Sequence, residues 1–460
     1  MHNPNRHRPP RSKNSRRRGG SPLPLFDQGY QAGYEKGKKA GYGDFEQPFE
    51  GTSIIIPTFN KKSLLLQCLD SIEAHTSYPY EVIVVDDASS DGTSEALRHR
   101  RKVRLAVHAE NAGFAGSVNT GLMMAKGRTI LVLNNDVLVT ENWLSNMLSC
   151  LNSEPDIGAV GPVTNYIGGE QQIEAPYRDI AEMWGFAAAH NRKDPQRWRR
   201  TDRLVGFCLL MKRETVIRTG YFDEGYRVGN YEDDDWMIRL RLQGLKLMIA
   251  GDAFIHHFGS ETMKSLNHAD VSQTSKANQD YFHQKWGNVH ERLAQVEARR
   301  SEGTPEPAGD NRSESYPVQV LASSGNGTLY WLELGNRYRI QGTDAASLAR
   351  QFPSVSAIRL SQRALQRIPY GGEWELPEAV QAISRALSPE GRFGEGSVME
   401  LPDGRFYQMD RGKVLRFWTP YAARVWGLAD RARPVSPEEI AAFPEGPYVL
   451  PPIHLRSSNL

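Results

Sequence analysis

The chain of 460 residues has little cysteine and no long apolar run. Its three cysteines, Cys68, Cys150 and Cys208, are odd in number and far apart, so they predict neither a disulfide framework nor a clustered zinc site. No stretch approaches the roughly 20 apolar residues of a membrane span. The N-terminus also lacks the apolar core of a signal peptide. We therefore expect a cytoplasmic protein in a reducing compartment.

Glycine-rich phosphate loops are missing as well. The first apolar run is followed by Pro57-Thr-Phe-Asn60, so neither a dinucleotide fingerprint nor a P-loop is present, and a sugar nucleotidyltransferase signature is lacking too. The stretch from Asp87 begins like a calcium hand, but Arg98 stands where that loop needs a bidentate Glu. These absences exclude four classes of nucleotide or cation site.

The net charge of +2 conceals a basic N-terminus. Without the seven basic residues of positions 1–20 the rest of the chain has a net charge of 2 − 7 = −5. Such a tail is predicted to be disordered. Peripheral contact with an anionic membrane and a plainly solvated tail both stay open, and no specific nucleic-acid partner is expected. The seven residues are Arg6, Arg8, Arg11, Lys13, Arg16, Arg17 and Arg18.

A parallel sheet is predicted after residue 50. The segments 53–56, 81–85 and 129–133 are continuous apolar runs, and 63–72 between the first two has helical spacing. Strands that are apolar throughout indicate a sheet covered on both faces. Polar residues follow the last two of these strands, at Asp86-Asp87 and Asn134-Asn-Asp136. Because open α/β sheets bind ligands at the carboxyl ends of their strands, we expect a site there.

Four acids stand in a row at Glu232-Asp-Asp-Asp235, before the helical run that begins at Met237. One or two acids would suffice to favour a helix N-terminus. Like charges this close raise one another's pKa unless a cation or a proton intervenes. The cluster therefore indicates a general base or a site for a metal-bound diphosphate.

Seven segments together resemble family 2 glycosyltransferases with the GT-A fold, most closely the rhamnosyltransferase-type branch. The resemblance spans about residues 50–290 and implies an α/β fold with a mostly parallel central sheet. The segments, in the family's order, are 53–60 (SIIIPTFN), 82–93 (VIVVDDASSDGT), 111–121 (NAGFAGSVNTG), 131–136 (LVLNND), 205–213 (VGFCLLMKR), 220–224 (GYFDE) and 231–235 (YEDDD).

The resemblance implies roles for the strand-end residues. Asp87 would bind the nucleotide base, with Pro57 and Phe59 lining its pocket. Asn111 and Asn119 would line the nucleotide–sugar side, although turn and helix-cap roles remain open for both.

A metal site is also implied. Asp136, last in the family's DXD-like motif, would bind Mn²⁺ or Mg²⁺, although Asn134 stands where many relatives have an acid. The segment Ile255–Ser260 would add a histidine for the metal or diphosphate, and its His-x-Gly spacing favours His257 over His256.

The acid cluster resembles the motif whose Asp after Glu is the catalytic base, which is Asp233 here. Asp235 would either support the site from behind or orient the acceptor, and Glu232 would help to orient the acceptor. Asp234 falls where relatives usually have an apolar residue, so a register shift from Asp233 to Asp234 stays open.

Processive polysaccharide synthases are excluded, because they carry Gln-x-x-Arg-Trp after the acids together with membrane spans. Here Arg197-Trp198 precedes the acids, within a basic loop for which an anionic acceptor and plain solvation stay open. Its basic members are Arg192, Lys193, Arg197, Arg199, Arg200 and Arg203.

The composition divides the chain into five parts. We expect a basic tail (1–20), a Gly/Tyr-rich arm (21–50) that is either a docking segment or a linker, a GT-A domain (51–300), a linker (301–315) and a two-repeat α+β domain (316–460). Gly327-x-x-Tyr330-x4-Gly335 matches Gly404-x-x-Tyr407-x4-Gly412, which predicts two β-hairpins, each followed by a short helix, at 345–352 and at 420–428. The repeat aromatics would stack on sugars or form a small core. They include Tyr330, Trp331, Tyr338, Tyr407 and Trp418.

These observations lead to one expectation and one alternative. We expect an inverting glycosyltransferase that moves one sugar from a UDP- or dTDP-linked donor to a cell-envelope glycan, lipid-linked or protein acceptor by metal-assisted single displacement. The alternative is a non-catalytic carbohydrate-binding or assembly protein with a degenerate transferase domain.

Overall fold

The computed structural model describes residues 48–259, 268–301, 316–388 and 391–457. The predicted tail at 1–20, nearly all of the predicted arm at 21–50 and of the linker at 301–315 lie outside the described residues.

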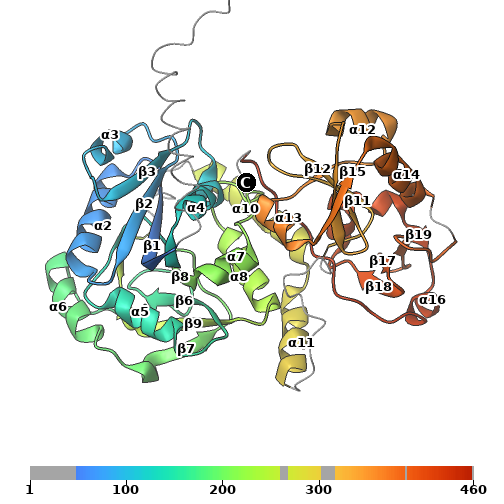
Figure 1. Cartoon of the computed structure of the whole chain (residues 1–460). Coiled ribbons are helices and arrows are strands. Elements are labelled where there is room, and N and C mark those ends of the chain that lie inside the picture. Colours follow the sequence, from blue (N-terminus) through green and yellow to red (C-terminus); the bar gives the residue numbers. More distant parts are fainter. Residues whose placement is uncertain (1–47, 260–267, 302–315, 389–390, 458–460) are drawn as a thin grey trace, which may run out of the picture. The chain divides into compact units, whose positions relative to one another are not determined.

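The main feature is an eight-stranded sheet in the order β3-β2-β1-β4-β8-β6-β9-β7 (Figure 1). The pairs β1–β2, β1–β4, β2–β3 and β6–β9 are parallel, while β4–β8, β6–β8 and β7–β9 are antiparallel. The expected α/β fold with a mostly parallel sheet is therefore confirmed. The strands are β1 (Phe49–Thr58), β2 (Tyr80–Asp86), β3 (Val103–Val107), β4 (Gly127–Leu133), β6 (Ile157–Val163), β7 (Trp198–Thr201), β8 (Cys208–Lys212) and β9 (Lys246–Phe254).

Helices cover both faces of this sheet, as the continuous apolar strands require. Ile54 and Ile56 of β1 pack with α2 and α5 on one face, and Ile55 between them packs with α4, α6 and α8 on the other. This alternation follows from the period of two residues along a strand. The helices of this part are α2 (Lys62–His75), α3 (Thr93–Leu97), α4 (Gly113–Met124), α5 (Trp143–Leu151), α6 (Ile180–His190), α7 (Arg213–Thr219), α8 (Glu232–Leu242), α10 (His268–Trp286) and α11 (Val289–Ser301), with a 3-10 turn at Pro195–Arg197.

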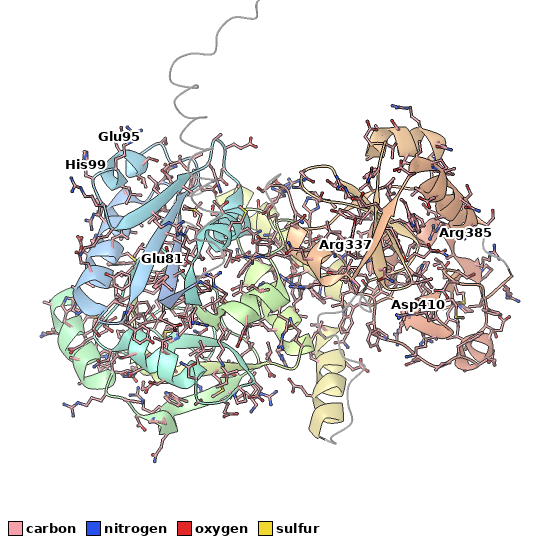
Figure 2. The ribbon with its side chains drawn as sticks, viewed as in Figure 1. Glu81, Glu95, His99, Arg337, Arg385 and Asp410 are labelled. Atoms are coloured by element: carbon pink, nitrogen blue, oxygen red, sulfur yellow. The ribbon has the colours of Figure 1, made fainter. Side chains whose placement is uncertain are left out.

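Glu81 on β2 connects the start of the sheet to the end of α4 (Figure 2). Its Oε1 accepts from Ser53 Oγ at 2.6 Å and from the Lys126 amide at 2.7 Å, and its Oε2 lies 2.7 Å from an Arg104 nitrogen. Arg104 also donates to the carbonyl of Met124, the last residue of α4. A cation at a helix C-terminus complements the helix dipole.

Residues 316–457 build two smaller sheets, in the orders β14-β11-β12-β13-β15 and β18-β17-β16-β19. In each, an antiparallel hairpin turns at a Gly with positive φ, at Leu334-Gly335 and at Arg411-Gly412. Whether the sheets descend from one repeat stays a prediction. The strands are β11 (Val320–Ser323), β12 (Leu329–Glu333), β13 (Asn336–Ile340), β14 (Ile358–Arg359), β15 (Tyr370–Trp374), β16 (Val398–Glu400), β17 (Phe406–Asp410), β18 (Lys413–Arg416) and β19 (Arg433–Pro434).

Short helices accompany each sheet. Arg337 lies beside α13 (Figure 2) and donates to the carbonyls of Leu365, at 2.5 Å, and of Ile368, just past the helix end. The helices are α12 (Ala345–Gln351), α13 (Gln362–Arg367), α14 (Leu376–Leu387), α15 (Pro420–Val425) and α16 (Pro437–Ala441), with a 3-10 turn at Ala429–Arg431.

The aromatic residues of the C-terminal sheets mostly form core. Trp331, Tyr407 and Trp418 are at most 2% exposed. Their burial leaves no open ring face for a sugar and favours the packing interpretation over stacking. Among the helices that the structure describes, none combines the length and apolar character needed to cross a bilayer.

Candidate active site

Three strand ends meet at one edge of the central sheet. Because β1 pairs in parallel with both β2 and β4, the ends of these strands bring Thr58, Asp86 and Leu133 to the same edge. The edge is tied across by Asn135, whose Nδ2 donates to Thr58 Oγ1 at 2.7 Å. The polar residues that the sequence places at the ends of these strands therefore lie together in the structure.

Asp136 and His257 come together through a separate two-stranded sheet, β5 (Val137–Leu138) with β10 (His256–His257). Asp136 Oδ1 lies 3.2 Å from His257 Nε2, and both residues are at most 3% exposed. Neither of these two atoms has a hydrogen-bond partner among the described residues. A buried polar atom without a partner is costly, so each such atom needs an explanation.

The imidazole tautomer supplies that explanation. His257 Nδ1 lies 2.8 Å from the carbonyl oxygen of Tyr166, a pure acceptor, so Nδ1 carries a hydrogen; in the neutral ring Nε2 then presents a lone pair. Two acceptors then face each other, an arrangement that a shared cation satisfies. A backbone acceptor on the other ring nitrogen is the usual support of a metal-binding histidine. The two residues therefore fit a divalent cation.

His256 has a different role. Its Nδ1 lies 2.6 Å from the Tyr177 hydroxyl, and burial lowers its pKa to about 4. Adjacent strand residues point to opposite sides, so His256 cannot share the position of His257. No group of three or more His, Cys, Asp or Glu side chains suited to a metal occurs in the part of the chain that the structure describes. The protein thus offers a pair of ligands.

The acid cluster begins α8, as predicted. Asp233 is 7% exposed, and its Oδ2 accepts from the Gly206 amide at 2.8 Å while its Oδ1 accepts from the Asp234 amide at 2.9 Å. Burial, and then the charge of Asp234, raise the pKa of Asp233 to about 6. Asp234 itself is held by both ends of the Arg203 guanidinium, at 2.6 and 3.1 Å. This pairing leaves Asp233 as the better candidate for a base.

Glu232 is 5% exposed, and its Oε2 has no hydrogen-bond partner among the described side chains and backbone groups. Burial, followed by the charge of Asp233, raises its pKa to about 8. At neutral pH this side chain is therefore mostly protonated and can donate a hydrogen bond.

Of the two roles left open for Asp235, the structure favours the supporting one. It is fully buried, and its carboxylate accepts from Lys285 at 2.6 Å, Trp286 Nε1 at 2.8 Å and Arg239 Nε at 2.9 Å. Burial acts to raise the pKa of Asp235, but Lys285 and Arg239 outweigh it, and the pKa is lowered. An acid with this many donors is a structural anchor, which argues against an acceptor-orienting role.

Two candidate nucleotide-binding residues also bond to their own chain. Asp87 accepts from the amides of Ala112 at 2.8 Å and Gly113 at 2.9 Å, and a His108 ring nitrogen lies 2.7 Å from it. Asn119 is 0% exposed. Its Nδ2 donates to the Phe222 carbonyl and to Glu224, and its Oδ1 accepts from the Phe222 amide.

Asp87, for which a contact to the nucleotide base was expected, instead accepts from two amides at the start of α4. For Asn119, whose structural role had stayed open, the structure favours a role in the interior. In this arrangement Asp87 holds the first turn of α4, and Asn119 holds the loop before α8.

The other nucleotide candidates keep their place at the strand-end edge. Pro57 is buried near the end of β1, and Phe59, just beyond it, is half-buried. Asn111 is exposed, and its side-chain oxygen accepts from the Gly113 amide at 3.1 Å. His108 was missed because β3, which ends just before it, is interrupted by Arg104 and does not read as an apolar strand.

The basic loop is largely paired within the chain. Arg197 donates to the carbonyl of His190 at 2.8 Å, Arg200 lies 2.9 Å from Glu297, and Arg203 holds Asp234. An acceptor-binding role for these three side chains is therefore not supported.

The comparisons with known proteins concern the family rather than individual residues. Residues 53–219 match the model of glycosyl transferase family 2. The chain is 30% identical over 232 residues to the O-antigen biosynthesis protein RfbC of Myxococcus xanthus, covering 46% of this chain and 18% of that protein. It is 26% identical over 241 residues to the chondroitin synthase of Pasteurella multocida, covering 45% and 24%. The chain thus spans less than a quarter of the length of either relative.

Among solved structures, a mannosyltransferase from Pyrobaculum calidifontis in complex with GDP-Man and Mn²⁺ is 20% identical, with a TM-score of 0.36, covering 62% of this chain and 86% of that one. A complex of GalNAc-T7 with UDP, GalNAc and Mn²⁺ is 18% identical, with a TM-score of 0.38, covering 52% and 51%. Scores this low carry no conclusion for this chain.

Proposed function

Because residues 53–219 form a family 2 glycosyltransferase domain, we propose that the protein transfers a single sugar, with inversion, from a UDP- or dTDP-linked donor to a hydroxyl acceptor. The acceptor class is a cell-envelope glycan, a lipid-linked glycan or a protein. The names of the two relatives, an O-antigen biosynthesis protein and a chondroitin synthase, support a glycan product. Contact of the basic N-terminal tail with an anionic membrane belongs to the same proposal.

The observation that carries the proposal is the pair of unsatisfied acceptors at Asp136 and His257. Carboxylate oxygen and neutral imidazole nitrogen suit Mn²⁺, and Mg²⁺ also binds such sites while keeping several waters. Asp136 and His257 would hold the cation, which supplies positive charge opposite the leaving diphosphate. With two protein ligands, the remaining positions are available to phosphate oxygens and water.

Asp233 would take the proton from the acceptor hydroxyl. Its pKa of about 6 lies close to the working pH, where a general base is most effective. The amides of Gly206 and Asp234 hold its carboxylate in one orientation. As the acceptor oxygen bonds to the anomeric carbon, the bond from that carbon to the diphosphate oxygen breaks, and the proton passes to Asp233. A single displacement of this kind inverts the anomeric centre.

The test is calorimetric titration of UDP, dTDP and GDP into the purified protein with Mn²⁺ and again with EDTA. We expect one diphosphate to bind only with metal. The matching nucleotide sugars are then supplied, and release of the diphosphate is measured together with the anomeric configuration of the free sugar. Failure of every nucleotide to bind would overturn the proposal and favour a carbohydrate-binding protein built on a degenerate transferase domain.

A further inference from the structure

The segment before the acid cluster has an unusual backbone. Val228, Asn230 and Tyr231 have φ of 65°, 82° and 74°, and Gly229 between them has φ of 157°. Positive φ is disfavoured for residues with a side chain, above all for a β-branched one such as Val228. Several such residues in succession persist only where surrounding groups hold them, and they occur typically at functional sites.

Asn278 of α10 is the group that holds this segment. Its Oδ1 accepts from the Arg227 amide at 3.0 Å, and its Nδ2 lies 2.9 to 3.2 Å from the carbonyls of Arg227, Gly229 and Asn230. Asn278 is 2% exposed. One side-chain amide therefore contacts four backbone groups of residues 227–230: it accepts from one N–H, and its two N–H groups are shared among three carbonyls.

Lys285, two turns further along α10, holds the other end of the same region. Its ammonium group is fully buried and contacts the carboxylates of Asp223 and Asp235. Asp235 is also paired with Arg239, so two buried acids face two buried cations. Tyr281 lies between the two α10 residues and donates to Asp223 at 3.0 Å.

These three α10 residues share one face, because positions i, i+3 and i+7 of a helix lie above one another. We name Asn278, Tyr281 and Lys285 the α10 stripe. On one side of the held segment, the Phe114 amide at the start of α4 donates to the carbonyl of Val228 at 3.4 Å. On the other side α8 begins with Glu232 and Asp233. The stripe thus fixes the segment between the first turn of α4 and the candidate base.

We propose that the α10 stripe is the positioning element of the transferase site. Asn278 and Lys285 set where α8 begins and therefore where the Asp233 carboxylate lies, without contacting substrate themselves. This inference rests on the proposed function. A base that is displaced by a fraction of an ångström loses turnover, while binding of the nucleotide, which does not depend on the base, is kept.

The primary variant is Asn278→Ala, with Gln279→Ala as its matched control, since Gln279 is the neighbouring amide on the exposed face of α10. The measurements are kcat and KM for release of nucleotide diphosphate from UDP-glucose, UDP-N-acetylglucosamine and dTDP-rhamnose, and the Kd of UDP and dTDP with Mn²⁺. We expect kcat to fall about 10- to 100-fold in Asn278→Ala with Kd unchanged, and no change in Gln279→Ala.

A second measurement does not depend on turnover. Amide hydrogen exchange over residues 227–236 should accelerate in Asn278→Ala and stay at the wild-type rate in Gln279→Ala, because only the first loses the four contacts. For Lys285, the Arg variant should retain more turnover than the Met variant, because Arg keeps a cation between the two acids. Lys276→Met, on the exposed side of α10, is the control for Lys285→Met.

The outcomes separate the two proposals. If the wild-type protein binds metal and nucleotide and turns over, but Asn278→Ala has the wild-type kcat and exchange rate, the stripe inference is wrong and the proposed function stands. Equal loss of kcat and of nucleotide affinity would also overturn the inference, because it indicates general unfolding. If the wild-type protein binds no nucleotide, the proposed function fails and the inference fails with it.

Discussion

Buried acidic side chains have opposite environments in two regions of residues 48–301. One region, which we call the open group, comprises Asp136, His257, Glu232 and Asp233, where acceptor atoms lack partners or a carboxyl pKa is raised. The other, the closed group, comprises Asp223, Asp235, Arg239 and Lys285, where every carboxylate faces a cation. The two groups meet on α8, because Asp233 and Asp235 are two residues apart.

The difference distinguishes side chains that are available to bind a ligand from side chains that stabilise the fold. In the closed group each carboxylate is paired with a cation, and removing one partner leaves an uncompensated charge in the interior. An open group costs stability and persists only if something else completes it, such as a cation, a proton or a substrate.

The largest expected effect is in the open group. Asp233→Asn should lower turnover by about 10²- to 10⁴-fold, because it removes the general base while keeping the size of the side chain. Nucleotide affinity should remain at the wild-type value. Steady-state kinetics and calorimetry check this, and Asp234→Asn serves as the control since that residue is paired with Arg203. A larger loss in Asp234→Asn would show that the register of the base had been assigned wrongly.

In the closed group the effect should appear in stability. Lys285→Met leaves Asp223 and Asp235 without their shared cation, and we expect the free energy of unfolding to fall by about 3–5 kcal/mol. Lys276→Met should change it by less than about 0.5 kcal/mol. Urea denaturation followed by tryptophan fluorescence measures both. Similar values for the two variants would contradict the distinction between closed and exposed charges.

The pH dependence of stability should have opposite signs in the two groups. The pKa of Glu232 is raised from 4.5 to about 8, so the folded state binds more protons than the unfolded state between these values and stability falls as pH rises through that window. Asp235 has a lowered pKa, so its contribution is present above its ordinary value of 3.8 and is lost as pH falls below it.

Glu232→Gln should therefore flatten the decline in Tm from pH 5 to pH 8, whereas Asp235→Asn should leave that decline and lower Tm throughout. Scanning calorimetry at a series of pH values makes the comparison. An unchanged slope in Glu232→Gln would show that Glu232 is not the titrating group.

The smallest effect concerns the attachment of the C-terminal sheets to α10. Trp418 Nε1 donates to the carbonyl of Trp286 at 3.1 Å, whereas the equally buried Trp331 Nε1 has no partner among the described residues. Trp418→Phe should therefore be more destabilising than Trp331→Phe, by about 1–2 kcal/mol. Chemical denaturation of the matched pair tests this, and an equal loss would indicate that this hydrogen bond contributes nothing.

The sequence predicted the sheet and its polar edge because strands covered on both faces must be apolar throughout and must end in polar residues. It also predicted Asp136 with His257 and the acids at the start of α8. It left Asp235 open between a supporting and an acceptor-orienting role, although helix geometry favours the first, since residues i and i+2 are about 200° apart around the axis and cannot face the same site.

The partners of Asp235 could not have been predicted. Lys285 lies 50 residues further along the chain, and a lysine at that position has no local signature that marks it as buried. The role of Asn119 stayed open for a similar reason, because its partners Phe222 and Glu224 are more than 100 residues away. A sequence pattern predicts the type of secondary structure and which positions are buried, whereas the direction of a polar side chain depends on partners far away in the chain.

The most direct test of the account is electron paramagnetic resonance of Mn²⁺ titrated into the protein with UDP or dTDP present. The decisive pair is His257→Ala and His256→Ala, two adjacent histidines of which one faces Asp136 and the other Tyr177. We predict that His257→Ala, like Asp136→Asn, loses the bound-metal signal and that His256→Ala keeps it. Retention of the signal in His257→Ala, or equal loss in both histidine variants, would contradict the claim that the unsatisfied pair is the metal site.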